Sequence, residues 1–454
     1  MRKSRLRFWR TAVPLAMLAI TVWLILGLAY PLPDESPLLL WLTRLDPLLL
    51  AAVWPIQGWP DWWWLPMLMI AVTIAFGRVF CGWLCPVGGL LNTLAWLMPS
   101  RLSRNQRLLQ SAGSSLKQMR WYWLAALLAM LAAGTSWPLL LTPFHLISQG
   151  IYEIWQNRLP WLIIVPVLLA VLLFPRFWCV YVCPIGLVLA GLSRWRKRLV
   201  ITNKCSQCQA CRHVCPMSAA DPEGRQITQD CMLCLRCRDI CPTEAVGWSS
   251  DRQVAGRVGA ESENVYYPSR RVVIKAALTA AGAYALSPAL LPSAQAGMLR
   301  PPGALAGAQF ALSCSRCGRC LKACPSQCLQ PVPLTGGFAN YLSPVIIPRQ
   351  ARCELCMICQ DVCPTGAITK ISEDQTAIGT AVLDNRSCIA WIEGKLCLVC
   401  REQCPRQAVE IDEHKRPSIN NDLCVGCGAC ENSCPLDEAA VIVIPPSQIA
   451  NRKA

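Results

Sequence analysis

Histidine is almost absent from this sequence, with three residues in 454. This scarcity argues against zinc sites, which commonly combine Cys with His. The chain has no C-x-x-C-H motif (the nearest, from Cys208 to His213, reads C-Q-A-C-R-H), which excludes attachment of a c-type haem. It also has no G-x-G-x-x-G motif after a strand and no P-loop, so neither an NAD(P)H site nor an ATP site is expected.

Acidic residues are also few, 27 against 43 basic ones, and the formal charge of +16 at first suggests a nucleic-acid partner. The distribution of the charge argues otherwise. The segments 1–10, 101–120 and 194–204 each hold five basic residues and no acidic residue. Each segment flanks an apolar stretch, which is the positive-inside pattern of membrane proteins. Membrane orientation therefore explains the charge, and no nucleic-acid binding is expected.

Four apolar stretches predict membrane-spanning helices, at 11–30, 62–77, 121–141 and 159–175. The first has no charged residue and about the length that crosses a ~30 Å hydrocarbon core. The second is shorter, but Arg78 beyond its end can extend to the interface. The Leu-rich stretch 37–56 contains charged residues and is predicted to lie at the interface. With the basic segments in the cytoplasm, the loops 31–61 and 142–158 are expected on the outer side.

The second and fourth stretches end in a repeated motif. Arg78-Val-Phe-Cys81-x3-Cys85-Pro86-Val87-Gly88 matches Arg176-Phe-Trp-Cys179-x3-Cys183-Pro184-Ile185-Gly186. Two helix pairs in the same orientation form a parallel repeat, so the two motifs should face each other near the cytoplasmic side.

The four cysteines of these motifs form a tentative redox or metal site: Cys81, Cys85, Cys179 and Cys183. At i and i+4, each pair is expected to lie on one helical face, and four facing thiols would bind metal or cycle as disulfides. The alternative is that a small Cys packs where the helix turns at Pro. Arg78 and Arg176 are interpreted as interfacial anchors, or as contacts to a quinone head group.

Cysteine is abundant, with 29 residues, and 24 of them fall into six four-cysteine runs that end in Cys-Pro. Five runs have the spacing C-x2-C-x2-C-x3-C-P, whereas Cys388 in the remaining one stands nine residues before Cys397. Three thiolates of such a run hold one [4Fe–4S] cube, and the fourth binds the neighbouring cube when runs are paired. The sequence therefore predicts six [4Fe–4S] clusters.

Each run is followed by a tail such as Cys241-Pro-Thr-Glu-Ala-Val, in which a short helical turn and then a strand are expected, as in the small α+β ferredoxin unit. Crossed pairing of the runs predicts these ligand sets: Cys205, Cys208, Cys211 with Cys241; Cys231, Cys234, Cys237 with Cys215; Cys314, Cys317, Cys320 with Cys363; Cys353, Cys356, Cys359 with Cys324; Cys388, Cys397, Cys400 with Cys434; and Cys424, Cys427, Cys430 with Cys404. Cys328 is surplus, and is interpreted as a spare thiol beside the Cys324 loop or as a substitute ligand.

The segment 249–299 contains Ser269-Arg270-Arg271-Val272-Val273-Ile274-Lys275, followed by an uncharged stretch with Ala294-Gln295-Ala296. A basic start, an apolar middle and an A-x-A end describe a secretory signal, and the paired Arg marks the twin-arginine type. The alternative is a fifth membrane helix, which Pro288 and Pro292 disfavour. Both interpretations deliver residues 300–454 to the outer side.

Together these features resemble the NapH and NapG ferredoxin-type proteins, which are close to the MauN and MauM pair, here joined in one chain. Residues 1–198 look like the NapH-type membrane domain and 199–248 like its cytoplasmic two-cluster domain. Residues 300–454 look like the four-cluster NapG-type domain, including Cys388-Ile-Ala-Trp391 before the third run. The expected fold class is membrane α-helical, with four transmembrane helices in a parallel repeat, plus α+β ferredoxin-like polycluster domains.

The resemblance implies a quinol dehydrogenase component that passes electrons from membrane quinol to a periplasmic reductase, typically nitrate reductase, or to its small electron-carrier subunit. It implies a location in the bacterial inner membrane, with the N-terminus and the first ferredoxin domain in the cytoplasm and the C-terminal domain in the periplasm. A second function class is a maturation factor, similar to the CcoG type, that reduces or escorts a metal during assembly. That class has no obvious need for four exported clusters.

Overall fold

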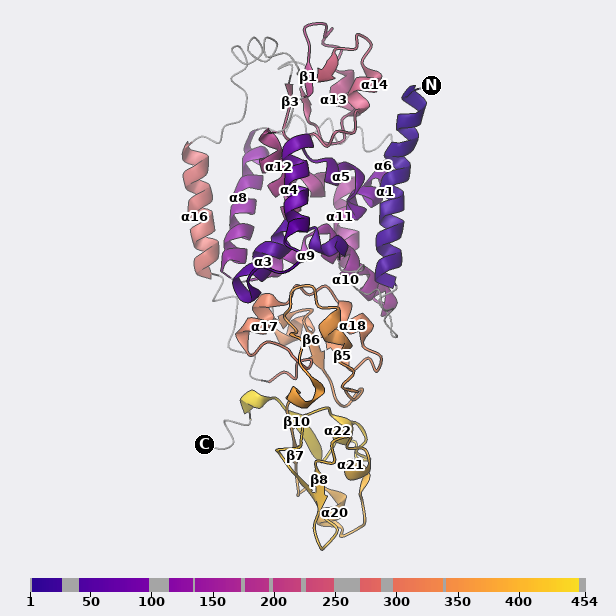
Figure 1. The fold of residues 1–454 in the computed structure, drawn as a ribbon, viewed down its shortest axis with the longest axis vertical. Helices are drawn as coiled ribbons and strands as arrows, with labels where there is room; N and C mark the ends of the chain where they lie inside the picture. Colours follow the sequence, from indigo (N-terminus) through magenta and orange to yellow (C-terminus); the bar gives the residue numbers. More distant parts are fainter. Residues whose placement is uncertain are drawn as a thin grey trace. The chain divides into compact units, whose positions relative to one another are not determined.

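The computed structural model describes residues 2–26, 41–97, 114–133, 135–172, 176–195, 199–221, 226–248, 270–286, 297–337 and 340–448 (Figure 1). The chain forms two compact units. The first comprises Met1–Leu26 and Trp41–Ser287, and the second comprises Gly27–Leu40 and Pro288–Ala454. Each unit has its own core.

The first unit is mainly helical up to residue 195. Its helices are α1 (Arg2–Leu26), α3 (Pro47–Gln57), α4 (Trp64–Phe76), α5 (Val79–Trp83), α6 (Pro86–Leu97), α8 (Ser114–Ala132), α9 (Trp137–Leu140), α10 (Pro143–Trp155), α11 (Trp161–Leu172), the π-helix η1 (Trp178–Val182), α12 (Pro184–Leu192) and the 3₁₀ turn η2 (Ser193–Trp195). The apolar stretches 62–77 and 159–175 contain the helices α4 and α11. The stretches 11–30 and 121–141 overlap α1 and α8, which begin nine and seven residues earlier than expected, and α8 already ends at Ala132.

Local sequence explains where these helices begin and end. The Asp46 carboxylate accepts a hydrogen bond from the Leu48 N–H (2.8 Å) and so caps α3, whose first residue is Pro47. Helices α3 and α4 end at Gly58 (φ 75°) and Gly77 (φ 82°), where the backbone adopts a positive φ that glycine tolerates best.

The segment 142–158, expected to be a loop, is largely the helix α10. Thr142 is extended, Pro143 opens the helix, and every side chain from Pro143 to Glu153 is buried. The sequence interpretation failed here because the polar residues of this segment suggest solvent exposure, whereas the structure packs the helix against α1, α6, α9 and α11.

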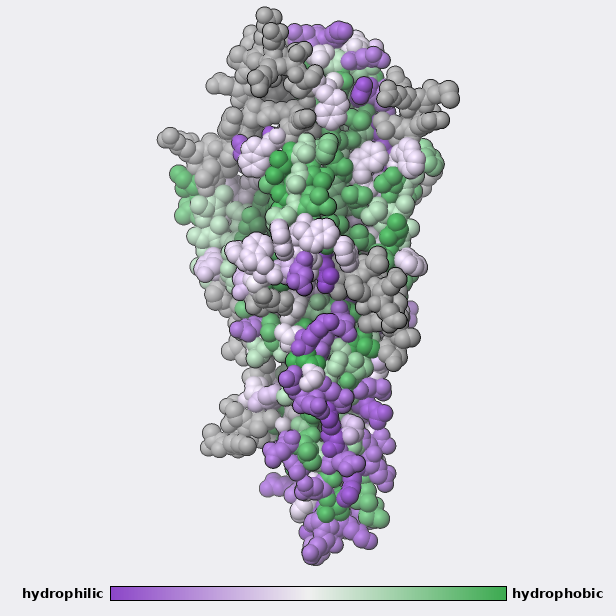
Figure 2. Space-filling view, viewed as in Figure 1, coloured by the Kyte–Doolittle hydropathy of each residue, from purple (hydrophilic) through white to green (hydrophobic). Residues whose placement is uncertain are grey.

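Within the described residues, one helix, Phe8–Leu26, is both long and apolar enough to cross a bilayer. Trp64–Phe76, Trp161–Ala170 and Ile274–Leu286 are apolar but shorter. Figure 2 shows the apolar residues of this helical layer gathered in a band over α4 and its neighbours.

The helix α16 (Arg270–Leu286) begins at the paired arginines and packs along α8 (Figure 1). Ile274, Leu278 and Leu286 on α16 are more than half exposed. The A-x-A sequence at 294–296 lies outside the described residues.

A small α+β domain completes the first unit. It contains β1 (Leu199–Ile201), α13 (Ala210–Val214), β2 (Ala220–Asp221), β3 (Gln226–Ile227), α14 (Arg236–Ile240) and β4 (Val246–Trp248). The strands form two antiparallel pairs: β1 pairs with β4, in the register Leu199↔Trp248, and the hairpin β2–β3 lies between the two cysteine runs.

The second unit repeats this plan twice. Its elements are α17 (Ala308–Ser313), α18 (Arg319–Ala323), β5 (Leu329–Pro331), η3 (Leu334–Gly336), β6 (Pro344–Ile346), α19 (Ile358–Asp361), η5 (Glu373–Gln375), β7 (Thr380–Leu383), α20 (Ile389–Ile392), α21 (Val399–Glu402), β8 (Val409–Ile411), β9 (Pro417–Ile419), α22 (Ala429–Asn432) and β10 (Val441–Ile444). The inner hairpins are β5–β6 and β8–β9; the outer pairs are β7–β10 and a single bridge, Ala304↔Ile368.

This arrangement confirms the α+β ferredoxin-type units expected from the cysteine runs. One detail differs: the short helix contains the third Cys of a run and ends before the fourth, as α13 does, and only a hydrogen-bonded turn follows Cys-Pro.

Candidate iron–sulfur centres

The five regular cysteine runs share one backbone conformation. In each, the residues on both sides of the second Cys have a positive φ, between 53° and 80°: Gln207 and Gln209, Leu233 and Leu235, Arg316 and Gly318, Leu355 and Met357, Gly426 and Gly428. Left-handed backbone is costly for residues other than Gly, and it persists where the surrounding structure requires it. Here it coils each loop so that three thiols converge.

The irregular run lacks this conformation. Leu398, between Cys397 and Cys400, has a φ of −115°, and Cys388 is supplied from the N-terminus of α20 instead. The longer spacing of this run therefore corresponds to a different way of bringing the first cysteine to the loop.

Four cavities are each lined by four cysteines drawn from two different runs. These sets are Cys205, Cys208, Cys211 and Cys241; Cys314, Cys317, Cys320 and Cys363; Cys388, Cys397, Cys400 and Cys434; and Cys404, Cys424, Cys427 and Cys430. They coincide with four of the crossed ligand sets expected from the sequence. The four cavities are similar in size, about 300 to 370 Å³ including the solvent-filled space at their mouths.

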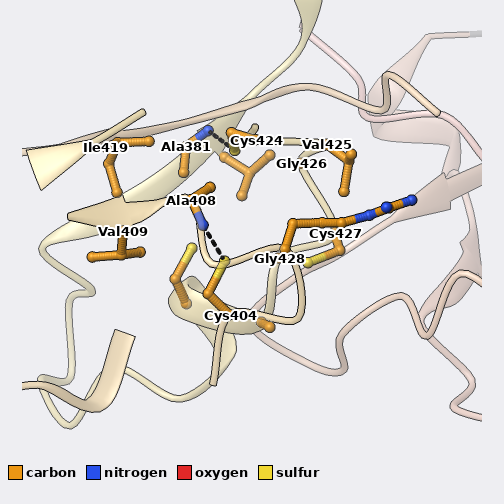
Figure 3. Close-up of a pocket in the computed structure, with 14 residues that line it drawn as sticks. Ala381, Cys404, Ala408, Val409, Ile419, Cys424, Val425, Gly426, Cys427 and Gly428 are labelled. Carbon is orange, nitrogen blue, oxygen red and sulfur yellow. Dashed lines mark hydrogen bonds between the residues drawn. The ribbon is translucent and has the colours of Figure 1, made fainter. Parts of the chain in front are cut away.

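Figure 3 shows the last of these cavities. Cys404, from one run, lies opposite the loop that carries Cys424 and Cys427, and the apolar side chains of Val409 and Ile419 line the same cavity. The walls of the other three cavities also combine cysteines with apolar residues.

The other two predicted sets are also brought together. Cys215 lies within range of the charges of Cys231 and Cys234, and Cys237 interacts with all three. Cys359 likewise interacts with Cys353, Cys356 and Cys324.

Backbone N–H groups point at the fourth cysteine of several runs. The amides of Ala219, Ala245 and Ala408 donate to the Sγ atoms of Cys215, Cys241 and Cys404, at 3.2, 3.3 and 3.3 Å. In each case the donor is the buried Ala of the recurring Cys-Pro-x-x-Ala tail, four residues after the acceptor. Hydrogen bonds to ligand sulfurs are one determinant of a cluster's reduction potential.

The pKa values of the cysteine thiols and the distances between them indicate what kind of metal site these cavities can hold. Burial raises the pKa of the Cys237 and Cys430 thiols to about 12, so binding iron as thiolates releases protons. Among the described residues, no three His, Cys, Asp or Glu side chains lie close enough to hold one metal ion. A cube of four irons separates its ligands farther than a single ion does, and the residues present fit such a cluster.

Cys328 lies beside the Cys324 loop, as the sequence suggested. Its side chain is buried, and its Sγ lies 3.6 Å from that of Cys324. It also contacts Cys353, a second cysteine of the same predicted set.

A pair of single substitutions separates the two interpretations of Cys328. We expect Cys328→Ala to leave the iron content of anaerobically purified protein unchanged, because Cys324 already completes the set of four. Cys324→Ala should lower it by about four irons per chain, from about 24. Iron loss in Cys328→Ala with none in Cys324→Ala would show that Cys328 is the ligand.

The four cysteines of the repeated motif are all buried, but not on single helical faces. Cys81 lies in α5 and Cys179 in the π-helix η1, whereas Cys85 and Cys183 lie beyond the ends of these helices, just before the prolines that open α6 and α12. The i, i+4 expectation was therefore wrong, because Pro86 and Pro184 disfavour helical backbone at the Cys that precedes each of them.

The two motifs nevertheless face each other through a reciprocal contact. The Arg78 guanidinium donates to the Cys179 carbonyl (2.7 Å), and that of Arg176 donates to the Cys81 carbonyl (3.1 Å). A Cβ at Gly88 would lie 2.9 Å from Arg176, and one at Gly186 would lie 3.0 Å from Arg78, so both glycines make room for the crossing arginines.

Both arginines are fully buried, so the prediction that they act as interfacial anchors was wrong. Arg78 also forms an ion pair with Asp230 (3.0 Å), which is shared with Arg120 (2.8 Å). Asp230 directly precedes the cluster loop that begins at Cys231, and a Cβ at Gly82 would meet the Met232 carbonyl at 2.9 Å. The cysteine motifs thus pack directly against the second loop of the first ferredoxin domain.

Sequence reasoning missed Asp230 and Arg120. Their roles depend on pairs separated by more than a hundred residues. The one available signal was an acidic residue placed directly before a cysteine run.

Comparison with family models places iron–sulfur domains in five segments of the chain. A model described as "4Fe-4S binding domain" matches residues 61–105 and 157–202, so one model covers both copies of the repeated motif. A "4Fe-4S dicluster domain" model matches 313–367 and 395–437, and a further "4Fe-4S binding domain" model matches 202–218. No solved structure matches the chain.

Several curated relatives of this chain are named as ferredoxin-type proteins. The ferredoxin-type protein NapG of Escherichia coli K12 is 35% identical over 170 residues, which cover 33% of this chain and 71% of NapG. The methylamine utilization ferredoxin-type protein MauM of Methylorubrum extorquens AM1 is 34% identical over 198 residues, which cover 39% of this chain and 90% of MauM. NapG of Haemophilus influenzae is 35% identical over 209 residues, or 39% of this chain and 72% of its own. The chain therefore belongs to the NapG and MauM family of ferredoxin-type proteins and is an iron–sulfur electron-transfer protein.

Proposed function

We propose that this chain is a quinol dehydrogenase relay, which passes electrons from a membrane quinol to a periplasmic reductase of the nitrate reductase type or to its small electron-carrier subunit. The observation that carries the proposal is the set of cavities lined by four cysteines from two runs. A bound [4Fe–4S] cluster supplies one-electron exchange. Crossed ligand sets keep two such sites within one small core, as Cys211 and Cys237 show in the first ferredoxin domain.

A membrane location is supported by the surface of the first unit. Exposed tryptophans lie near both ends of its helices: Trp9 and Trp195 at the ends that carry the basic segments, and Trp54, Trp64, Trp155 and Trp161 at the opposite ends. Tryptophan is enriched at both membrane interfaces, and the apolar band of Figure 2 belongs to the same helices. We infer four spanning helices, α1, α4, α8 and α11, in a parallel repeat.

The N-terminal part is proposed to be NapH-like and fused to the NapG-like part. In this arrangement residues 1–198 form the membrane domain, 199–248 a cytoplasmic two-cluster domain, 249–299 a linker with an internal twin-arginine signal or anchor, and 300–454 a periplasmic four-cluster domain. The packing of Gly82 against Met232 supports a joint role for the first two parts. The cysteines at 81, 85, 179 and 183 would then lie between quinol and the clusters.

A reduction experiment tests the proposal. In anaerobic membranes, a ubiquinol or menaquinol analogue should reduce the clusters, whereas NADH should not, because the sequence has no dinucleotide site. The measurement is the visible absorbance and the EPR signal of the reduced clusters. Clusters that stay oxidised under excess quinol, although dithionite reduces them, would contradict the relay and favour a maturation factor.

A further inference from the structure

The helix α10 has its polar face buried. At 3.6 residues per turn, its polar side chains and the capping Thr142 fall within an arc of roughly 140°. These are Thr142, His145, Ser148, Gln149, Tyr152 and Glu153, and all of them are buried. A buried polar face is unusual, because polar atoms lose their hydration and need partners in exchange.

Several atoms of this face lack such partners among the described residues. The Gln149 amide has no partner except the Glu153 carboxylate beside it, and one oxygen each of Glu153 and Asp46 is buried without a hydrogen bond. Leaving a buried polar group unsatisfied is destabilising, so such a group is expected to have a partner. Asp46, at the start of α3, joins the cluster because its carboxylate lies beside the Thr142 hydroxyl, and this hydroxyl is 2.9 Å from Nδ1 of His145.

The rest of α10 is apolar. Leu146, Ile147 and Ile151 occupy it and are buried, and a Cβ at Gly150 would collide with Ile163 of α11. A few convergent polar groups on an otherwise apolar, buried helix suit a small, largely apolar ligand with polar ends. A quinol has this character, with an apolar ring and two opposed hydroxyl groups that donate hydrogen bonds.

The two carboxylates are suited to take up the protons that quinol oxidation releases. Both residues lie outside the four proposed spans. Burial raises the pKa of the Asp46 carboxyl to about 7, and it raises that of the Glu153 carboxyl to about 7 as well. A general base works best when its pKa lies near the operating pH.

A route for electrons leads away from the same face. Phe144, next to His145, packs against Phe80 with ring centroids 5.9 Å apart, and Phe80 precedes Cys81. The motif that contains Cys81 in turn contacts the first ferredoxin domain through Arg78 and Asp230.

We propose that the buried polar face of α10, with Asp46, forms the quinol-oxidation site. His145 and Gln149 hold the two ring hydroxyls, and Asp46 and Glu153 accept the two protons. The O–H bonds break, quinol becomes quinone, and its two electrons pass singly to two oxidised iron–sulfur clusters. This inference rests on the proposed quinol dehydrogenase function.

Two substitutions that keep side-chain volume test the site. In Glu153→Gln and Gln149→Leu, reduction of the clusters by decyl-ubiquinol or menadiol should slow about 100-fold, as expected for the loss of a general base or of a positioning contact. Reduction by dithionite and the iron content should stay unchanged. Glu413→Gln, at an exposed carboxylate, serves as the matched control and should behave as the native chain.

Photolabelling gives a readout that does not depend on the clusters. A photoreactive azido-quinone should label the peptide that contains residues 142–158 in the native chain and in Glu413→Gln, and the labelling should be lost in Gln149→Leu. Labelling elsewhere, or native quinol rates in both variants, would overturn the site. Failure of quinol to reduce the native clusters while α10 is still labelled would contradict the relay and leave the binding site standing.

Discussion

Asp230→Asn should lower the thermal midpoint of the first unit by about 10 °C, because it removes the one carboxylate shared by two buried arginines. Arg78 is fully buried and Arg120 nearly so, and their ion pairs with Asp230 measure 3.0 and 2.8 Å. Breaking a buried ion pair from one side costs about 3–5 kcal/mol, since the remaining charges cannot recover their hydration. Asn keeps the shape of the side chain, so the loss of charge is isolated.

The midpoint would be followed by the visible absorbance of the clusters on heating under argon in detergent. Glu244→Gln removes a carboxylate charge from an exposed position of the same ferredoxin domain, and its midpoint should stay within about 2 °C of the native value. If Asp230→Asn and Glu244→Gln melt together, the contact between the cysteine motifs and the cluster loop does not stabilise this unit.

The second large effect concerns export of the C-terminal domain. Iron–sulfur clusters are assembled in the reducing cytoplasm, so the proposed periplasmic four-cluster domain would have to cross the membrane already folded, as the twin-arginine route allows. We therefore expect Arg270→Lys with Arg271→Lys to strand residues 300–454 inside, while the helices upstream still insert. In the structure these arginines begin α16.

Protease added to spheroplasts should digest the C-terminal domain of the native chain and spare that of the double variant. Arg252→Lys with Arg257→Lys, in the preceding polar segment, is the matched control and should leave digestion as in the native chain. Equal digestion of the native chain and the Arg270/Arg271 variant would identify α16 as an ordinary membrane helix. It would contradict export of residues 300–454 by the twin-arginine route.

Cysteine spacing by itself determined the iron–sulfur chemistry and the ferredoxin-type units. The reason is that a C-x2-C-x2-C run specifies a local loop: the left-handed residues on either side of Cys208 or Cys427 and the N–H bonds four residues after Cys215 depend only on neighbours in sequence. The pairing of runs follows from the same local geometry repeated across a short hairpin. Apolar length likewise located α4 and α11, and it identified α1 and α8 with shifted ends.

Only the tertiary structure decided what happens to charged and polar residues near the helices. Arg78 at the end of an apolar stretch suggested an interfacial anchor, and the polar residues of α10 suggested a loop, yet both are buried. Their partners are far away in sequence: Asp230 for Arg78, and Asp46 beside Thr142. The periodicity and composition of a segment indicate the environment that each of its residues prefers without distant partners. Burial of a charged side chain depends instead on an opposite charge that the tertiary structure brings from elsewhere in the chain.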